Sequence, residues 1–544
     1  MTWYGSPASL RRRFSLLALA AGVLCGAAAC DDPARTDPVA AVELTAPSTF
    51  LDVGQTLTLS VTLKDASGQA LTGRRVSWSS SNQVVATVEE GVVTGRTPGK
   101  ATITAAAGGK EARVEVTVEP PVSRVTVEPD SFFLVVGNTV KIQAPVADHL
   151  ANALARILAV PRDAAGGVML GHSLRFRSSD PAVATVSDSG EVRGVAPGRT
   201  TIEVVAGAAA GRLHLTVERP YTLTYLGTLP GLEHSQARAI NELGQVAAVS
   251  WTGQSTSRRA FVWENGRVTP LNLLTGTEPG SQLEDAVAIN ELGQVAGLLR
   301  AGNTQSVFLW RNGQTVLAPF PGARGQVTDL NDRGEIVGFW MDDFCTRNCR
   351  GGGFLVRNGQ LTHLSNYGLL RIHPNAVNEA GQITGVIFRA GAGTESGRAF
   401  FLESESAPIT FLPTNEVASQ GLDLDAQGRV YGGDLVSSGT IRAFRWSQGG
   451  APAYLGALRG GTVSHARRAN NRGVAVGDSN CPGCPSSVPV LYRDGMVVRV
   501  NDLFAAGDWS FEGVTDINDR GQIVGYGRHV RTGATGALLL TPPQ

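Results

Sequence analysis

Between residues 40 and 218, apolar and polar residues alternate in short runs that are separated by glycine-containing turns. The run 56–63 alternates threonine or serine with leucine or valine, and the turn signal 65–68 follows it at once. Alternation with a period of two places the apolar side chains on one face of a strand. Short alternating runs at regular spacing, with turn signals between them, predict an all-β sandwich.

The same region contains two copies of one pattern. Blocks 76–81, 85–88, 91–99 and 101–104 match blocks 174–179, 183–186, 190–198 and 200–203 at an offset of 98 or 99 residues. The first block, 53–54, matches 136–137 at an offset of 83, so the second copy contains an insertion of about 15 residues near 146–157. Residues 148–156 are good helix formers and predict a short helix on a loop. We expect two domains, 40–119 and 121–218.

Three motifs recur in order in both copies. The first copy reads V-S-W-S-S-S at 76–81, V-A-T-V at 85–88 and P-G-x-A-x-I from 98. These motifs resemble the bacterial immunoglobulin-like group 2 domain, which implies surface spacer or adhesin modules without catalytic residues. Trp78 and Phe176, on equivalent strands, are predicted to lie in the core between the two sheets of each sandwich.

A second repeat occupies residues 220–544. A box of the form apolar-Asn-x-x-Gly-Gln-Val occurs seven times. Its first polar residue is Asn241, Asn290, Asn331, Asn378, Asp425, Asn470 and Asn518 in turn, at spacings of 41 to 49 residues. A period in the forties is typical of the four-stranded blades of a β-propeller.

Each box is predicted to be a tight hairpin between the first and second strands of a blade. The asparagine side chain can bond the backbone two residues on, and the glycine suits a left-handed conformation, as in a type I turn with a bulge. An aromatic or apolar strand such as 261–263 follows each box, and a fourth strand follows six of the seven. The run 221–229, before the first box, could supply the missing strand and close the ring, which protects strand edges.

We therefore predict an all-β protein with two immunoglobulin-like β-sandwiches followed by a seven-bladed β-propeller at 220–544. The repeat resembles the HAF-repeat family of probable extracellular proteins. This resemblance implies an extracytoplasmic location and little about chemistry.

Loops between the second and third strands vary in length, so a ligand is expected on the face that carries them. If the first strand of each blade is innermost, residues five positions before the box asparagine ring the channel mouth. These candidate ligand-binding residues are Gln236, Asp285, Gln326, His373, Gln420 and His465, with Gly513 at the seventh position. Six polar residues in seven suggest a small polar or glycan-like ligand, although water in the channel would favour the same residues.

The amino terminus has the pattern of an export signal. Three arginines, Arg11 to Arg13, precede 16 residues of mostly apolar character at 14–29, a length suited to a signal peptide rather than a membrane-spanning helix. The sequence A-A-A-C at 27–30 resembles the lipobox of bacterial lipoproteins. It implies a lipid on Cys30, a signal peptide at 1–30 and a polar tether at 31–39. Ordinary cleavage after Ala29 is the alternative.

The balance of charged residues narrows the classes of partner that the protein is expected to bind. Lys+Arg and Asp+Glu both number 47, so no basic excess exists to bind nucleic acid. No zinc-protease, nucleophile-elbow or P-loop motif is present, and we expect no cofactor and no metal. Segments 423–428 and 516–521 faintly resemble calcium loops, but they coincide with the hairpin box. His373 and His465 lie in blades that are not adjacent, which argues against a shared metal.

Four cysteines lie outside the leader, as the pairs Cys345/Cys349 and Cys481/Cys484. Exported proteins usually oxidise such pairs. We expect two local disulfides that hold long loops, with zinc binding or redox catalysis as the alternative.

The sequence favours a non-enzymatic lipoprotein that is anchored to the bacterial envelope, faces the periplasm or the cell exterior, and binds a protein or glycan. Two alternatives stay open. One is an extracytoplasmic carbohydrate-active enzyme that uses a pair of carboxylates near the channel. Glu284 and Asp285 lie in one predicted blade and Glu512 in another, and they are the candidates for such a pair. The other is a purely structural envelope protein.

Overall fold

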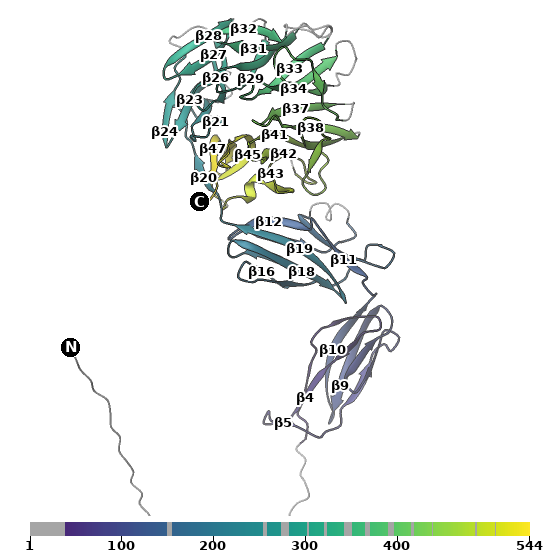
Figure 1. Cartoon of the computed structure of the whole chain (residues 1–544). Coiled ribbons are helices and arrows are strands. Elements are labelled where there is room, and N and C mark those ends of the chain that lie inside the picture. The colour runs from purple at the N-terminus through teal and green to yellow at the C-terminus, as the bar shows by residue number, and fades with distance from the viewer. Residues whose placement is uncertain are drawn as a thin grey trace, which may run out of the picture. The chain divides into compact units, whose positions relative to one another are not determined.

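The computed structural model describes residues 38–148, 155–253, 258–273, 282–301, 304–319, 324–341, 351–364, 370–389, 397–414, 418–437, 439–484, 487–505 and 507–544. Within these ranges the regular elements are β-strands and one short 3-10 helix, η1 (Val500–Asp502) (Figure 1). The chain separates into two compact units, Met1–Val118 and Glu119–Gln544.

The first unit is the first predicted sandwich. Its strands form three sheets: β1 (Ala41–Thr45), β4 (Ser60–Lys64) and β5 (Ala70–Leu71); β2 (Phe50–Asp52), β10 (Lys110–Glu119), β9 (Gly99–Ala107) and β6 (Ser77–Ser80); and β3 (Thr56–Thr58), β8 (Val92–Gly95) and β7 (Ala86–Glu89). Alternate residues of β9 are buried, as the period-two pattern predicts. Ile103 and Val116 lie at the centre of the core, and Trp78 packs against it.

The second sandwich has the same plan. One sheet contains β11 (Arg124–Glu128), β14 (Ile157–Arg162), β13 (Thr139–Gln143), β17 (Glu191–Gly194) and β16 (Ala184–Val186), and the other contains β12 (Ser131–Val135), β19 (Ala209–Glu218), β18 (Gly198–Ala206) and β15 (Arg175–Ser178). Phe176 packs against its core, as predicted. The insertion lies between β13 and β14. Most of its predicted helix, residues 149–154, falls outside the described residues, and Ile157 already belongs to strand β14.

A glycine repeated in both sandwiches is explained by the aromatic ring beside it. Gly190 has a φ of +82°, and a Cβ there would lie 2.6 Å from the carbonyl oxygen of Ile142 and 2.9 Å from the ring of Phe176. In the first sandwich Gly91 has a φ of +83°, and a Cβ there would lie 3.1 Å from the ring of Trp78. Glycine alone fits both the left-handed backbone and the space.

Residues 220–544 form a β-propeller. Six antiparallel sheets, numbered here one to six, contain four consecutive strands each. Sheet one has β21 (His234–Ile240), β22 (Val246–Trp251), β23 (Arg259–Glu264) and β24 (Arg267–Pro270), and sheet two has β25 (Gln282–Ile289), β26 (Val295–Ala301), β27 (Thr304–Arg311) and β28 (Gln314–Pro319). Sheet three has β29 (Arg324–Leu330), β30 (Ile336–Met341), β31 (Gly351–Arg357) and β32 (Gln360–Leu364), and sheet four has β33 (Leu370–Val377), β34 (Ile383–Arg389), β35 (Gly397–Leu402) and β36 (Thr410–Phe411). Sheet five has β37 (Ser419–Leu424), β38 (Val430–Ser437), β39 (Thr440–Trp446) and β40 (Ala453–Gly456), and sheet six has β41 (Ser464–Ala469), β42 (Ala475–Ser479), β43 (Val488–Arg493) and β44 (Met496–Arg499).

The seventh four-stranded sheet joins the two ends of the propeller. Its order is β20 (Thr222–Tyr225), β47 (Thr535–Thr541), β46 (Ile523–His529) and β45 (Trp509–Ile517). Strand β20 runs antiparallel to β47, with Thr222 opposite Thr541 and Leu223 opposite Leu540. This pairing confirms that the run before the first box supplies the strand missing from the last sheet.

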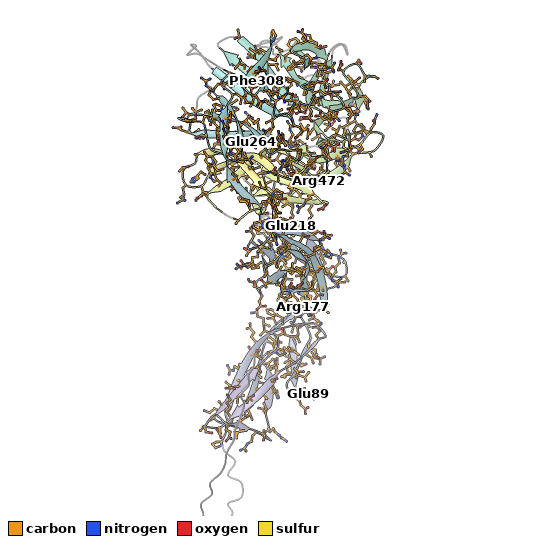
Figure 2. All side chains as sticks on the ribbon, turned by 60° about the vertical axis from the view of Figure 1, so that its left-hand side comes forward. Glu89, Arg177, Glu218, Glu264, Phe308 and Arg472 are labelled. Carbon is orange, nitrogen blue, oxygen red and sulfur yellow. A yellow bond between two sulfur atoms is a disulfide. The ribbon has the colours of Figure 1, made fainter. Side chains whose placement is uncertain are left out.

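The predicted aromatic strand is the third strand of each sheet. Phe261, Phe308, Phe354, Phe400 and Phe444 occupy it in sheets one to five, and their side chains are fully buried. Figure 2 shows Phe308 within the dense layer of side chains inside the propeller. The aromatic position is therefore a packing position.

Candidate functional site

The seven boxes form seven similar turns. In the first, the N–H of Gly244 donates to the carbonyl oxygen of Asn241 over 3.0 Å, and Gly244 has a φ of +83°. The N–H of Gln245 donates to Asn241 Oδ1 over 2.9 Å. The box is thus a tight turn with a left-handed glycine, as predicted from its sequence.

The box asparagines also join neighbouring sheets, a role that sequence reasoning missed. Asn241 Nδ2 donates to the carbonyl oxygen of Asn290 over 3.0 Å. The same bond follows from Asn290 to Asn331, Asn331 to Asn378, Asn378 to Asp425, Asn470 to Asn518, and Asn518 back to Asn241. Asp425 lacks an amide, and there Arg429 Nη2 instead donates to the carbonyl oxygen of Asn471 over 2.9 Å. A ring of buried hydrogen bonds therefore holds the sheets together.

A second ring lies beside the first. The residue just after the box asparagine carries a carboxylate or an amide, and its side chain accepts the backbone N–H of the residue at the same position in the preceding sheet. Glu291, for example, accepts the N–H of Glu242 over 2.9 Å. Asp332, Glu379, Asn471, Asp519 and Glu242 act likewise. Burial raises the pKa values of Glu242, Glu291 and Glu379, and neighbouring carboxylates add to that rise. Arginines of the same turns, Arg333, Arg472 and Arg520, oppose the rise.

The channel interior contains three aspartates around one arginine. Asp329, Asp423, Arg468 and Asp516 stand two positions before the box residue of their sheets and line a cavity of about 200 Å³. Each carboxylate accepts a backbone N–H from the next sheet, as Asp516 does from Ile240 over 2.9 Å. These charged residues were not singled out from the sequence as channel residues, although two of them begin the segments with a faint calcium-loop pattern.

Burial raises the pKa values of all three channel aspartates, and the positive charge of Arg468 opposes this shift. The pKa of Asp516 rises to about 6. Within the described ranges, no three carboxylate, histidine or cysteine side chains form a group that could hold a metal ion. The three carboxylates can take up or release protons, and their hydrogen bonds to backbone N–H groups hold neighbouring sheets together.

The six predicted mouth residues lie on the first strands of their sheets, but none lines this cavity. Gln326 and Gln420 are exposed and Gln236 is half-buried. Asp285 accepts a hydrogen bond from Arg238 over 3.0 Å. The prediction that these residues bind a ligand remains a prediction.

The two histidines of this set have separate environments. His373 stacks on Phe339 at 4.2 Å between ring centres. Burial, with a contribution from Arg371, lowers its pKa to about 4, so the ring is neutral at physiological pH. His465 Nδ1 lies 3.2 Å from a carboxylate oxygen of Asp478.

The carboxylates considered for glycoside hydrolysis are each held by an arginine. Glu284 is 1% exposed, bonds Arg259 over 3.0 Å and also accepts the N–H of Ala260. Glu512 bonds Arg528 over 2.7 Å. The first ion pair joins β23 of sheet one to β25 of sheet two, and the second joins β45 to β46 within sheet seven.

One predicted disulfide is present, between Cys481 and Cys484 in the loop joining β42 to β43. Cys345 and Cys349 lie outside the described residues, as does Cys30. Among the described residues, no helix is long and apolar enough to cross a membrane.

The second sandwich docks on sheet six of the propeller. Phe133 and Val135 of β12 share one buried cluster with Val498, Leu503 and other propeller residues. Arg493 of β43 bonds Glu218 of β19 over 2.9 Å, and Figure 2 places Glu218 where the side chains of the two domains meet. The two domains therefore share a core.

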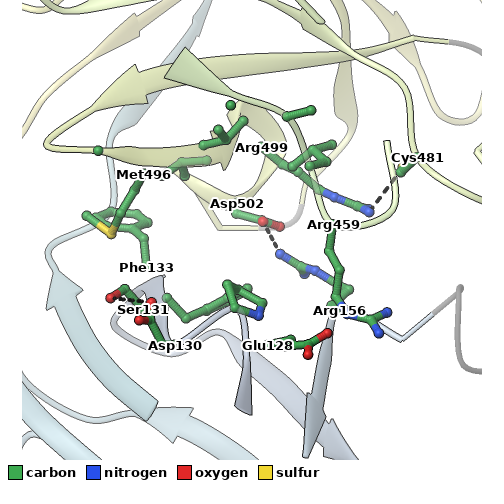
Figure 3. Close-up of a pocket in the computed structure, with 18 of the residues that line it drawn as sticks. Glu128, Asp130, Ser131, Phe133, Arg156, Arg459, Cys481, Met496, Arg499 and Asp502 are labelled. Carbon is green, nitrogen blue, oxygen red and sulfur yellow. Dashed lines mark hydrogen bonds and ion pairs between the residues drawn. The ribbon is translucent and has the colours of Figure 1, made fainter. Parts of the chain in front are cut away.

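The insertion of the second sandwich adds polar contacts to this junction. Arg156 forms an ion pair with Asp502, and Arg459 Nη1 donates to the carbonyl oxygen of Ala155 over 3.0 Å. Asn138 Nδ2 donates to the carbonyl oxygen of Asp502 over 3.4 Å. A cavity of about 400 Å³ lies beside these contacts (Figure 3). The first sandwich lacks this insertion.

Comparison with known proteins finds one family in two segments of the chain. Residues 38–118 and 161–217 match the family of bacterial Ig-like domains (group 2), and the second match begins after the insertion. No curated protein matches the chain.

Solved structures show similarity at low identity. Domains 4 and 5 of the S-layer protein SbsC are 22% identical over 33% of this chain and 98% of that one, with a TM-score of 0.15. A prolyl endopeptidase is 12% identical over 57% of this chain, with a TM-score of 0.41, and the match spans 50% of its length. The β-propeller domain of the Trilobed protease from Pyrococcus furiosus is 11% identical over 57% of this chain and 91% of that one, with a TM-score of 0.34. The strand topology and the family match define the class of protein as all-β, with bacterial Ig-like domains followed by a β-propeller.

Proposed function

We propose that the protein is a non-enzymatic recognition protein of the bacterial cell surface. Its Ig-like domains carry the propeller, and the propeller binds a protein or glycan partner. The Ig-like family match and the lipobox at Cys30 support an extracytoplasmic, lipid-anchored location, and the resemblance to HAF repeats is consistent with it.

The observation that carries this proposal is the difference between the two faces of the propeller. One face consists of seven similar box turns in a ring of hydrogen bonds. The loops of the opposite face differ in length and composition from sheet to sheet. A rigid framework with variable loops on one face is the usual arrangement of a recognition surface.

The enzymatic alternative has less support. A glycosidase needs two carboxyl groups at a defined separation with the substrate between them. Glu284 is buried and bonded to Arg259, and Glu512 is bonded to Arg528. Since these groups are engaged in local ion pairs, recognition without catalysis fits the geometry better.

Glycan-array binding by residues 38–544 tests the proposal. Substituting the exposed Gln326 and Gln420 with alanine should weaken binding of any glycan that the wild type retains, because both lie near the predicted mouth. Gln314→Ala is the matched control, since Gln314 is exposed at the start of β28, beside the β27–β28 turn. Absence of glycan binding, together with no partner in cross-linking on intact cells, would favour the purely structural role.

Lipid attachment needs a separate test. Metabolic labelling with a palmitate analogue should mark the wild-type chain, and Cys30→Ala should abolish the label. An unlabelled wild-type chain would favour ordinary signal cleavage after Ala29.

A further inference from the structure

The cavity of about 400 Å³ lies between the second sandwich and sheet six. Its walls come from both domains and include the insertion, the disulfide loop and the link after β44; the segments are 128–133, 155–156, 455–459, 481–482, 494–499 and residue 502. Its volume falls in the range of small-molecule sites, which occur preferentially at domain interfaces.

Three arginines face one side of this cavity (Figure 3). Arg156 comes from the insertion, Arg459 from the link after β40, and Arg499 from the end of β44. Asp502 is the carboxylate on this side, and it pairs with Arg156. The lining contains four carboxylates in all, those of Glu128, Asp130, Asp494 and Asp502.

The other carboxylates of the lining have partners elsewhere. Glu128 lies 3.9 Å from Arg162, and Asp494 lies 3.8 Å from Arg493. Asp130, shown on the opposite side in Figure 3, accepts a hydrogen bond from the hydroxyl of its neighbour Ser131. Anion binding in this cavity therefore depends on the individual guanidinium groups and not on the net charge of the lining.

Arg499 has a weak partner for a half-buried guanidinium. Its Nη2 donates to Cys481 Sγ over 3.3 Å, and a disulfide sulfur is a poor acceptor. Burial and the positive charge of Arg156 lower the pKa of Arg499, whereas Asp502 raises it. An anion beside Arg499 would relieve this repulsion.

We propose that this cavity binds the anionic group of a small acidic saccharide, a carboxylate or phosphate held by Arg499 and Arg459. Planar guanidinium groups suit oxyanions because they donate parallel hydrogen bonds. Met496 lies across the cavity from the arginines (Figure 3) and offers an apolar surface to the sugar ring. This site is separate from the predicted mouth residues and does not depend on them.

The site also links the two domains. Arg156 belongs to the sandwich and Arg499 to the propeller, so a bound anion would bridge them. Ligand binding and docking of the second sandwich should therefore strengthen each other.

Calorimetric titration of residues 38–544 tests the proposal with three probes: inorganic phosphate, glucuronate and glucose. We expect phosphate and glucuronate to bind, glucuronate more tightly, and glucose not to bind. Affinity should fall as salt concentration rises. Arg499→Gln is the main variant because its bond lies within the propeller, and it should weaken glucuronate binding roughly tenfold or more.

Two controls make the result specific. Arg531→Gln removes an exposed arginine paired with Asp508 outside the cavity and should leave binding unchanged. If Gln326→Ala and Gln420→Ala weakened glucuronate binding and Arg499→Gln did not, the probe would bind at the predicted mouth and not in this cavity, so failure of the mouth prediction and failure of this site can be told apart. Arg459→Gln should reproduce the effect of Arg499→Gln, and a thermal melt of each variant checks that it folds.

Several results would overturn the inference. If neither phosphate nor glucuronate bound, or if Arg499→Gln bound them as the wild type does, the cavity would not be an anion site. Phosphate binding without glucuronate binding would refute the saccharide assignment.

Discussion

Replacing Asn290 with alanine would test whether the ring of box asparagines stabilises the propeller. Asn290 is 4% exposed. Its Nδ2 donates to the carbonyl oxygen of Asn331 and to the side chain of Gln294, and its Oδ1 accepts the N–H groups of Leu292 and Gln294. Alanine would remove four hydrogen bonds and leave buried groups unpaired.

The expected cost follows from these contacts. A hydrogen bond contributes about 1 kcal/mol net, and an unsatisfied buried group costs about 1–3 kcal/mol. Since water can reach part of the turn, Asn290→Ala should lower the free energy of unfolding of the propeller by about 3–5 kcal/mol.

The chain itself supplies a matched control. Sheet five has Asp425 in place of the asparagine, with Arg429 bonded to its carboxylate and bridging to Asn471. Asn290→Asp alone should be destabilising, because it buries a carboxylate without a cation. The double variant Asn290→Asp/Gln294→Arg reproduces the pair of sheet five and should recover most of that loss.

Guanidinium chloride denaturation, followed by tryptophan fluorescence, measures these differences, with the wild type and each single variant completing a double-mutant cycle. A loss below about 1 kcal/mol in Asn290→Ala would contradict the reasoning, because that is less than one such bond contributes. So would a double variant no more stable than Asn290→Asp.

Further variants test other parts of the structure. Gly190→Ala should destabilise the second sandwich by about 2–4 kcal/mol, because strain at positive φ adds to overlap with Phe176. Gly137→Ala is the control: Gly137 has a similar φ but open space around it, so the substitution should cost about 1 kcal/mol. Equal losses of stability by calorimetry would refute the packing argument. Because burial raises the pKa of Asp516 to about 6, above its unfolded value, the folded protein binds more protons and its stability should fall as pH rises from about 4 to 6. Asp516→Asn should reduce that slope in melting temperature against pH, and an unchanged slope would contradict it. Leu540→Ala, at a fully buried site next to the closing strand, should cost about 2–5 kcal/mol in unfolding measurements, and a near-neutral result would argue against a packed closure.

The sequence predicts the fold well because its signals are local and repeated. Each box contains the residues that its own turn requires, such as Asn241 and Gly244, and the run 221–229 has the pattern of the missing strand. The predicted aromatic positions, including Phe308, are likewise the centres of the sheets.

The channel residues were harder to predict because a β-bulge changes which side chains face inward. In sheet one, pairing with the second strand shifts between Ala237 and Ala239. Strict alternation from Gln236 would place residue 238 toward the channel, whereas Ala239 lines the cavity. Asp516 and Arg468 occupy the position equivalent to Ala239, so the alternation rule passed over them.

The contacts between domains could not be read from local patterns. The insertion was visible as a change in repeat offset, but nothing near Arg156 in the sequence indicates Asp502 as its partner. Likewise, the box asparagine was interpreted from its own turn, while its amide bonds a turn in the next sheet. Such pairings depend on how distant segments pack.

The pairing of β20 with β47 affects how the protein is made. Strand β20 is the first propeller strand to leave the ribosome, and its partner β47, residues 535–541, is the last strand of the propeller. The ring must therefore stay open until β47 has been made. A prematurely terminated copy would keep unpaired strand edges of the kind that aggregate and attract proteases, so closure separates finished molecules from fragments.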